Sequence, residues 1–244
     1  MSVRSLPLDP EPEGPTRVLP PPRTRHGYAR HCSMIAADIA EFSRYDRDDE
    51  VQLYLREQLY IILRAAFRAI GIDWDDPDEL YREDRGDGLT IVFEPHIPTG
   101  QLVTELPDPL LAGLGHHNKM SSHAAQIQLR LALHAGLVTR DTNGFAGRDA
   151  VHLFRILEAP LVKRHLAESG ADLALITSKY VHGNFIDNAT GPVNADAYTQ
   201  VKVSVKNTHA EVWYRLAGGP PPDHPRSANG HAVQQSLRAL GTGN

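Results

Sequence analysis

The sequence predicts an α+β sandwich, in which helices cover one or both faces of a largely antiparallel sheet. Strand-like segments come in pairs that are joined by short, glycine-bearing turns, and segments with a helical period lie between them. A hydrophobic content of 41% in 244 residues is sufficient for a packed core of ordinary size. Hairpin-paired strands with interspersed helices are typical of this fold class.

The folded domain is expected to occupy residues 27–216. Residues 1–26 contain seven prolines among charged and small residues, a composition that cannot bury enough surface to offset chain entropy. We therefore predict a disordered, proline-rich arm there. Residues 217–244 open with a run of glycine and proline, which predicts a flexible tail.

The first half of the domain reads as a strand, a long helix and a hairpin. Residues 34–39 form an apolar run, which predicts a buried strand. A helix should follow and end at Gly71, because apolar residues recur at helical spacing before that glycine. Segments 80–85 and 89–93 flank a Gly-Asp-Gly turn and predict an antiparallel hairpin. The apolar positions of the helix are Leu55, Leu59, Ile62, Ala66 and Ile70.

The middle of the domain contains both helical and strand-like patterns of apolar residues. A helix is predicted near 110–123, and alternating apolar residues over 127–133 predict a strand with one buried face. Residues 141–147 carry two glycines and are expected to form a loop. A helix should then run over 148–158, where Pro160 interrupts it before it resumes over 161–168.

The last segments predict a further strand and a closing hairpin. Residues 173–176 are apolar and should form the strand, after which Ser178 is placed to cap a short helix. Segments 201–205 and 211–216 read as the two strands of the final hairpin. With these elements, all the strands of the expected sheet are accounted for.

Composition excludes several classes of partner. The formal net charge is −5 and no long basic run is present, so no nucleic-acid partner is expected. No stretch reaches the roughly 18 to 20 apolar residues that a membrane span needs, so no membrane partner is expected either. The single cysteine, Cys32, cannot form an internal disulfide, which favours a cytoplasmic protein.

Two aspartates stand in settings typical of a metal site. Asp38 ends an apolar run, where an unpaired charge would cost several kcal/mol unless a cation meets it. Asp87 lies between Gly86 and Gly88 at the tip of the predicted hairpin. If the fold brings both together, they form a carboxylate pair of the kind that holds Mg²⁺ or Mn²⁺ against phosphate oxygens.

Five segments in this order resemble the class III nucleotide cyclase catalytic domain, the adenylate and guanylate cyclase family. The first is Asp38-Ile39-Ala40-Glu41-Phe42, similar to the first metal motif of the family, and Gly86-Asp87 is similar to the second. The others are the strand segment 131–136, Gly147 followed by a helix with Arg155, and Val205-Lys206. The resemblance covers about 180 residues and implies a ferredoxin-like or palm-type α/β sandwich.

The resemblance also implies an activity, the formation of a 3′,5′-cyclic nucleotide and pyrophosphate from a nucleoside triphosphate. By analogy, Asp38 and Asp87 would bind two Mg²⁺ or Mn²⁺ ions at each site, and Arg155 would stabilise the transition state. Lys206 would bind the terminal phosphate and Glu83 would contact the base. The family builds such sites from two subunits, so a head-to-tail homodimer is implied.

Three positions depart from the family pattern. Val151 stands four residues before Arg155, where the family has an asparagine, and Glu41 replaces a usual glycine. Glu83 is typical of guanylate-type members, because a carboxylate accepts hydrogen bonds from guanine, but Gly144 supplies no second contact. Pyrimidine substrates therefore stay open.

Two other functions remain as alternatives. One is a degenerate cyclase-homology domain that binds a nucleotide or a partner and regulates without catalysis, which Val151 favours. The other is a relative of diguanylate cyclases or polymerase palms, which share a similar core. This chain lacks their Gly-Gly-Asp/Glu-Glu-Phe signature, so this alternative ranks low.

Overall fold

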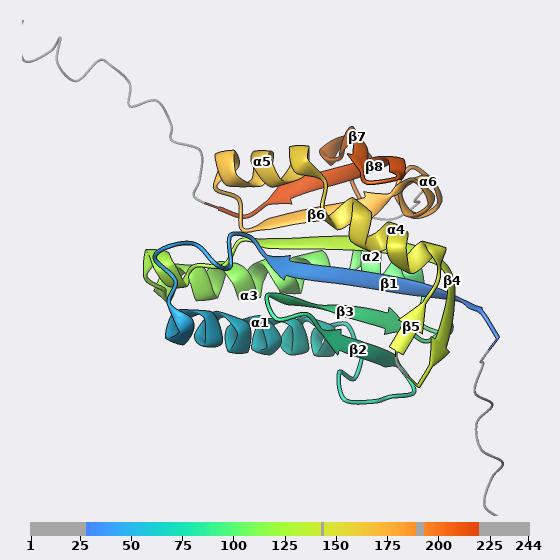
Figure 1. The fold of residues 1–244 in the computed structure, drawn as a ribbon, viewed down its shortest axis with the longest axis horizontal. Helices are drawn as coiled ribbons and strands as arrows, with labels where there is room; N and C mark the ends of the chain where they lie inside the picture. The colour runs from blue at the N-terminus through green and yellow to red at the C-terminus, as the bar shows by residue number, and fades with distance from the viewer. Residues whose placement is uncertain (1–27, 143, 189–192, 220–244) are drawn as a thin grey trace, which may run out of the picture.

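The computed structural model describes residues 28–142, 144–188 and 193–219 and folds them around a single sheet (Figure 1). The strands are β1 (Arg30–Ile39), β2 (Leu80–Asp84), β3 (Gly88–Phe93), β4 (Leu129–Asp141), β5 (Gly144–Ala146), β6 (Leu173–Ser178), β7 (Thr199–Val205) and β8 (Thr208–Ala217). The helices are α1 (Asp49–Ala69), α2 (Thr99–Thr104), α3 (Pro107–Met120), α4 (Arg148–Leu157), α5 (Pro160–Ser169) and α6 (Lys179–Phe185), with 3₁₀ turns at His123–Ala125 and Ala195–Ala197.

The sheet has eight strands in the order β2-β3-β1-β4-β6-β8-β7, with β5 paired to β4 alone. Neighbouring strands are antiparallel except for β4 and β6, which run parallel. This confirms the predicted α+β class with a largely antiparallel sheet.

The register defines two ends of the sheet. Ile39 pairs with Leu129, Leu129 with Leu173, and Leu173 with Ala217, so these four residues mark one end, here named the carboxylate end. The turn between β7 and β8 lies at the other end, here named the hairpin end. The chain segments at the two ends do not meet within one copy.

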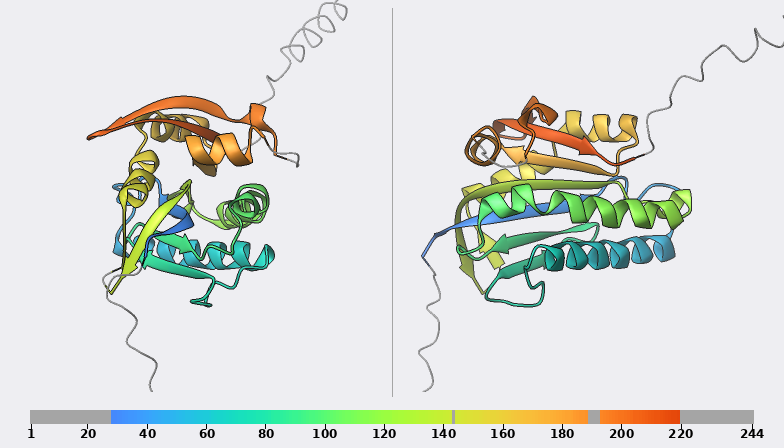
Figure 2. Two further views of the ribbon diagram at one scale, coloured as in Figure 1. Left: turned by 90° about the vertical axis from the view of Figure 1, so that its right-hand side faces the viewer. Right: turned by 180° about the vertical axis from the view of Figure 1, so that it is seen from behind.

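Helices cover both faces of the sheet (Figure 2). One core forms against α1, α2, α3 and α6 and contains Phe67, Phe93 and Ile35. A second core forms against α4 and α5 and contains Met34 and Leu153. Because both faces are covered, a polar residue on a central strand is buried whichever way it points.

Local sequence explains where the main helices begin and end. The side chain of Asp48 accepts a hydrogen bond from the Val51 backbone N–H at 2.9 Å and caps α1, which ends just before Gly71 at φ +77°. Ser178 caps α6 in the same way, through the N–H of Val181 at 3.3 Å, as predicted. Proline occupies the first turn of α5, which explains the predicted break before it.

Other boundaries differ from the sequence prediction. The expected loop over 141–147 contains β5, because β4 continues to Asp141 and turns back as a hairpin. Helix α2 was not predicted: it has six residues, includes a glycine and has no side-chain cap. Strand β8 is longer than predicted at both ends, because it runs from Thr208 to Ala217 and not over 211–216 alone.

The predicted arm at 1–26 and the tail beyond 219 lie outside the described residues. Gly219 is described, and its N–H donates to Asp172 Oδ2 at 2.8 Å. Among the helices that the structure describes, none is both long enough and apolar enough to cross a membrane.

Candidate active site

The two predicted metal ligands lie side by side at the carboxylate end. Asp38 pairs with Gly88 in the register of β1 and β3, and the Ile39 N–H donates to the Asp87 carbonyl oxygen at 3.0 Å. A Cβ atom on Gly88 would come within 2.0 Å of the Ala37 carbonyl oxygen. Glycine at position 88 therefore allows the hairpin to approach β1, and this approach brings Asp87 next to Asp38.

Asp38 is buried and already has a cationic partner. Its carboxylate receives two hydrogen bonds from Arg130, from Nε and Nη2, each at 2.7 Å. Burial raises the pKa of the Asp38 carboxyl to about 6, the Arg130 guanidinium opposes this rise, and the charge of Asp87 adds to it. At neutral pH the pair is thus an ion pair whose carboxylate is poorly solvated.

The donor set fits a divalent cation that also binds phosphate. Asp87 is partly exposed, and its carboxylate makes no hydrogen bond or ion pair with the described residues. Mg²⁺ is commonly held by one or two carboxylates together with substrate phosphates and water, so two adjacent aspartates suffice. Within the described part of the chain, no cluster of three or more His, Cys, Asp or Glu side chains is arranged to hold a metal ion by itself.

The loop after Asp38 is held by one buried arginine. Arg47 donates hydrogen bonds to the carbonyl oxygens of Ala40 and Glu41 at 3.1 Å, and to those of Ala124 and Gln126 at 3.0 and 2.7 Å. Glu41 has a φ of +51°, in the left-handed region that favours glycine. Glutamate at position 41 therefore has a backbone conformation that glycine would adopt at lower cost.

Arg155 lies on α4, which crosses the face of the sheet that carries Asp38. On the same helix, Leu153 and Ile156 are buried against the sheet, whereas Val151 is 50% exposed. Arg155 is half-buried and makes no hydrogen bond or ion pair with the described residues. The pKa of Asp38 is also raised slightly by Glu158, so the C-terminal end of α4 lies near the carboxylate end.

Lys206 lies at the hairpin end, far from the two aspartates. It is exposed in the turn between β7 and β8, where Val205 pairs with Thr208. Its φ is +52°, and it makes no hydrogen bond or ion pair among the described residues. From Thr208 to Ala217 the length of β8 separates this turn from the carboxylate end, about 30 Å at the usual rise per residue.

Glu83 is on β2, on the same face of the sheet as α4. Its carboxylate accepts hydrogen bonds from the Tyr81 hydroxyl at 3.2 Å and from Arg85 at 3.0 Å. A Cβ atom on Gly144 would lie 2.1 Å from Glu83 Oε1. The carboxylate of Glu83 thus occupies the space that a side chain at position 144 would need.

Aromatic rings surround this carboxylate. Phe145 meets Tyr81 edge-on, with ring centroids 6.3 Å apart, and stacks on Phe154 of α4 at 6.5 Å. Arg140 lies over the Tyr81 ring at 4.2 Å and Arg85 over the Phe154 ring at 4.7 Å. The surroundings of Glu83 are therefore aromatic and cationic, a suitable setting for a flat, polar ring.

Comparison with solved structures identifies the fold. The guanylyl cyclase Cya2 aligns with a TM-score of 0.55 and 14% identity, over 82% of this chain and 98% of that chain. An adenylate/guanylate cyclase/hydrolase from Silicibacter pomeroyi aligns with a TM-score of 0.52 and 20% identity, over 77% and 97%. The catalytic core of a rhodopsin-guanylyl cyclase, in complex with ATPalphaS, aligns at 0.51 and 14%, over 81% and 100%.

The chain has the fold of a nucleotide cyclase catalytic domain. No family profile matches the sequence, and no curated protein does so either. The resemblance seen in five short segments is therefore confirmed at the level of the fold, by structures that share at most 20% of their residues with this chain.

Within this cyclase fold, sequence reasoning missed Arg130. The residue falls in the predicted strand 127–133, at a position that a strand with one buried face would expose. Both faces of the sheet are covered, so Arg130 is 8% exposed and pairs with Asp38 directly across the strands. A lone arginine between leucines in a central strand was the signal that could have located it.

Proposed function

We propose that the protein is a metal-dependent nucleotide cyclase, which converts a nucleoside triphosphate into a 3′,5′-cyclic nucleotide and pyrophosphate. The observation that carries this proposal is the pair Asp38 and Asp87, brought together at one end of a cyclase fold, where the Asp87 carboxylate has no partner among the described residues. Arg155 and Lys206 support it, because both are cations without a protein partner among the described residues.

The reaction mainly requires that the protein position the substrate and stabilise the negative charge of its phosphates. The ribose 3′-oxygen attacks the α-phosphorus, the bond to pyrophosphate breaks, and the 3′-hydroxyl proton leaves to solvent. A bound Mg²⁺ or Mn²⁺ would lower the pKa of that hydroxyl and neutralise the triphosphate, and Asp38 and Asp87 would hold it. Arg155 would donate to the α-phosphate as negative charge develops, and Lys206 would meet the terminal phosphate as a point charge.

Arg130 adds a donor that this reaction can use. It already presents both nitrogens to Asp38 at 2.7 Å, and a cation at Asp38 would compete for the same carboxylate oxygens. The displaced guanidinium would then lie beside the incoming phosphates, where its planar fork suits two phosphate oxygens. Arg130 thus balances the charge of Asp38 before metal and substrate bind, and Asp87 is left as the uncompensated carboxylate of the site.

A complete site requires two copies of the chain. Asp38 and Lys206 lie at opposite ends of the sheet, too far apart to touch one triphosphate. When two copies pack head to tail, the carboxylate end of each meets the hairpin end of the other. We therefore propose a homodimer with two composite sites, acting in the cytoplasm, where nucleoside triphosphates are abundant.

The base is the least determined part of the substrate. Glu83 can accept two hydrogen bonds from guanine, and for this reason guanine is favoured. Both of its oxygens already accept hydrogen bonds, from Tyr81 and Arg85, and Gly144 offers no side chain beside them. A smaller pyrimidine ring is the second candidate.

A second candidate function is regulation without catalysis. Val151 supplies no donor for the ribose, and losing one positioned donor costs on the order of 10² to 10³ in rate. Such a domain would bind the nucleotide or a partner and release no product.

One experiment separates the two functions. The purified protein is incubated with ATP, GTP, CTP or UTP and with Mg²⁺ or Mn²⁺, and cyclic products are measured by mass spectrometry. Asp87→Asn removes the unpaired carboxylate, and Asp78→Asn is the matched control, because Asp78 is an exposed aspartate away from the site. We expect one nucleotide to give cyclic product, at least about 100-fold less with Asp87→Asn and an unchanged amount with Asp78→Asn.

Absence of product from all four nucleotides would overturn the cyclase proposal and leave the regulatory one. Product that Asp87→Asn does not reduce would overturn the assignment of the site. A regulatory domain would instead show metal-dependent nucleotide binding that Asp87→Asn weakens, with no turnover.

A further inference from the structure

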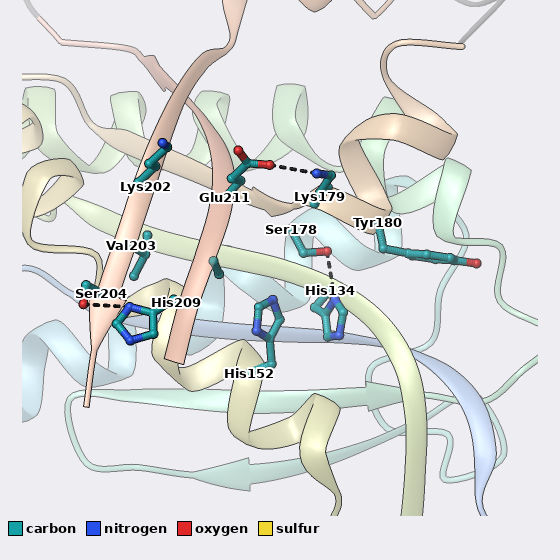
Figure 3. Close-up of a pocket in the computed structure, with 11 residues that line it drawn as sticks. His134, His152, Ser178, Lys179, Tyr180, Lys202, Val203, Ser204, His209 and Glu211 are labelled. Carbon is teal, nitrogen blue, oxygen red and sulfur yellow. Dashed lines mark hydrogen bonds and ion pairs between the residues drawn. The ribbon is translucent and has the colours of Figure 1, made fainter. Parts of the chain in front are cut away.

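The sheet has a gap at its hairpin end, and a cavity of 710 Å³ opens there (Figure 3). Strand β6 ends at Ser178, opposite Val212, while β8 continues from there to Thr208 with β7 as its strand neighbour on one side. Over 208–211, the backbone groups of β8 that point away from β7 pair with no other strand of the described chain. An extended segment can add to such a free edge and form hydrogen bonds with it.

The two faces of this edge differ in chemistry. Lys202 is paired with Glu211 in the register of β7 and β8, and Lys179 forms an ion pair with Glu211 at 2.8 Å, so these three side chains share one face. Figure 3 shows Glu211 between the two lysines. One carboxylate thus serves two ammonium groups, and this face has excess positive charge at neutral pH. On the other face, the paired Val203 and Ala210 pack against the core under α4.

Residues 9–13 of the chain, Asp-Pro-Glu-Pro-Glu, have a pattern that suits this edge. In a strand, every second residue directs its backbone N–H to the same side and its side chain to the same face. Asp9, Glu11 and Glu13 can therefore all present an N–H to β8. Pro10 and Pro12 lack an N–H, and they occupy the positions that face away from β8, where no donor is needed.

The side chains of such a strand match both faces of the edge. One of the two possible strand directions places the three carboxylates on the face of Lys179 and Lys202, and the two proline rings on the face of Ala210. Pro7 and Pro15 stand at positions where an N–H would have to face β8, so they limit the pairing strand to the residues between them.

The chain that carries this segment enters the fold beside the gap. Strand β1 begins at Arg30, at the hairpin end, and the ring of His31 lies 5.6 Å from that of Tyr180, which lines the cavity. From Glu13 to Tyr28 the chain can span about 45 Å, at the roughly 3.1 Å per residue of an extended proline-rich segment. The segment 9–13 can therefore reach β8 of its own chain.

Residues 220–244 do not meet these conditions. They follow Ala217, which marks the carboxylate end of the sheet, and their sequence has a single acidic residue, Asp223. Position and charge therefore both favour residues 9–13 as the occupant of the gap.

We propose that residues 9–13 of this chain bind in the gap as an added strand on the free edge of β8, with their carboxylates against Lys179 and Lys202. The segment before β1 is thus a ligand of its own domain at the hairpin end. This surface is separate from Asp38 and Asp87, and its occupation does not depend on cyclase activity.

The test uses the full chain and measures by NMR how near the segment comes to β8. Gly14→Cys carries a nitroxide spin label, and because Cys32 is buried, the label attaches to the new cysteine. The label broadens the signals of nearby backbone amides, and its reduction by ascorbate gives the reference spectrum. We expect strong broadening of the amides of 208–211.

His96 is the matched control position. It is exposed, and it follows Glu94, whose carboxylate accepts hydrogen bonds from Arg30 at the start of β1. A segment that is not docked would approach His96 as readily as it approaches β8. We therefore expect clearly weaker broadening at His96.

Two pairs of substitutions test the charge and the strand pairing separately. Lys202→Met should lower the equilibrium constant for docking about threefold, as expected for an exposed ion pair, whereas Lys119→Met, at an exposed lysine at the end of α3, should not change it. Glu11→Gln and Glu11→Pro both remove a charge, but only Glu11→Pro also removes the N–H that would pair with β8. We expect Glu11→Gln to reduce the broadening of β8 in part and Glu11→Pro to abolish it.

The proposal is overturned if His96 is broadened as strongly as β8, if Lys119→Met weakens docking as much as Lys202→Met, or if Glu11→Pro has no larger effect than Glu11→Gln. A mixture of isotope-labelled chains without the spin label and unlabelled chains that carry it tests for docking between copies. Equally strong broadening in this mixture would overturn the assignment to the same chain. Because no turnover is measured, failure of the cyclase proposal would not change any of these results.

Discussion

Glu41 and Lys206 are the non-glycine residues of the described chain that have a positive φ, in the left-handed region. Such residues cost roughly 1–2 kcal/mol each compared with an ordinary conformation. Both stand in segments that resemble cyclase motifs, one directly after Asp38 and one in the turn proposed to meet phosphate. Strain that persists at such positions is expected where the side chain or the turn has a function.

Replacing Glu41 with glycine should stabilise the protein. Glycine adopts a φ of +51° without steric cost, and within the described residues the substitution removes a single ion pair, the partly exposed contact with Arg44 at 3.7 Å. We expect Glu41→Gly to raise the free energy of unfolding by about 1 kcal/mol, and Tm by about 2–4 °C, in thermal denaturation. Glu57→Gly, on an exposed position of α1, should destabilise by about 1 kcal/mol. A decrease in Tm for Glu41→Gly would contradict the argument.

His134 should make folding stability depend on pH. Its pKa of about 4 in the folded protein lies below the usual histidine value of about 6.5, because burial, His152 and His31 disfavour the charged ring more than Asp149 favours it. Between these two pH values the unfolded chain binds more protons, so stability is complete above pH 6.5 and falls as the pH decreases toward 4. The loss attributable to this residue is about 3 kcal/mol at most.

Urea denaturation at pH 7, 5.5 and 4.5 measures this effect by comparison with His134→Gln, which keeps a polar group beside Ser178. The stability difference between the two proteins should shift in favour of the variant as the pH falls. A difference that is constant with pH would show that His134 does not titrate in this range.

At the scale of elements, the hairpin of β4 and β5 positions the residues around Glu83. Gly144 has a φ of +132°, and a Cβ atom there would meet Glu83 Oε1 at 2.1 Å. Glycine is thus required both by the backbone and by the neighbouring carboxylate. The hairpin also carries Phe145, which connects β2 to α4 through its contacts with Tyr81 and Phe154.

We expect Gly144→Ala to destabilise the protein by about 1–3 kcal/mol in urea denaturation, since the backbone strain remains even if the carboxylate moves. Adding Glu83→Ala should recover the part due to the clash and leave the part due to φ. Gly115→Ala is the matched control, because open space surrounds Gly115 within α3 and alanine favours a helix. Equal effects of the two glycine substitutions would contradict this account.

The elements were predictable where their signals are local. The α1 pattern before Gly71, the Gly-Asp-Gly turn and the proline before α5 each specify an element from a few neighbouring residues. The boundaries of β4 and β8 were not predictable in this way, because strand ends are set by the length of the partner strand. The position of Asp87 followed from its turn, whereas Arg130 beside Asp38 required a strand register that no local pattern encodes.

At the scale of the whole molecule, the opposite placement of Asp38 and Lys206 governs how the site is assembled. In a head-to-tail dimer, one copy would supply the aspartates of a site and the other copy would supply its lysine. Two different inactive variants can then restore activity together, provided that one has intact aspartates and the other has an intact lysine.

Asp87→Asn and Lys206→Met are each expected to abolish most of the cyclase activity. When both are co-expressed, random pairing gives mixed dimers that contain one intact site, so about one quarter of the wild-type activity should return. Asp38→Asn with Asp87→Asn, which damage the same half, should return none. If Asp87→Asn and Lys206→Met also fail to complement while both remain dimeric in light scattering, the two residues act within one copy.

Arg47 has a consequence for affinity. Its guanidinium holds four carbonyl oxygens from two loops, so the segment directly after Asp38 is ordered in the protein alone. Ordering a loop on binding costs conformational entropy, and this cost reduces the affinity for the ligand that orders it. Here that cost is met during folding. A cation or phosphate that binds beside Asp38 therefore enters a site that is already preorganised.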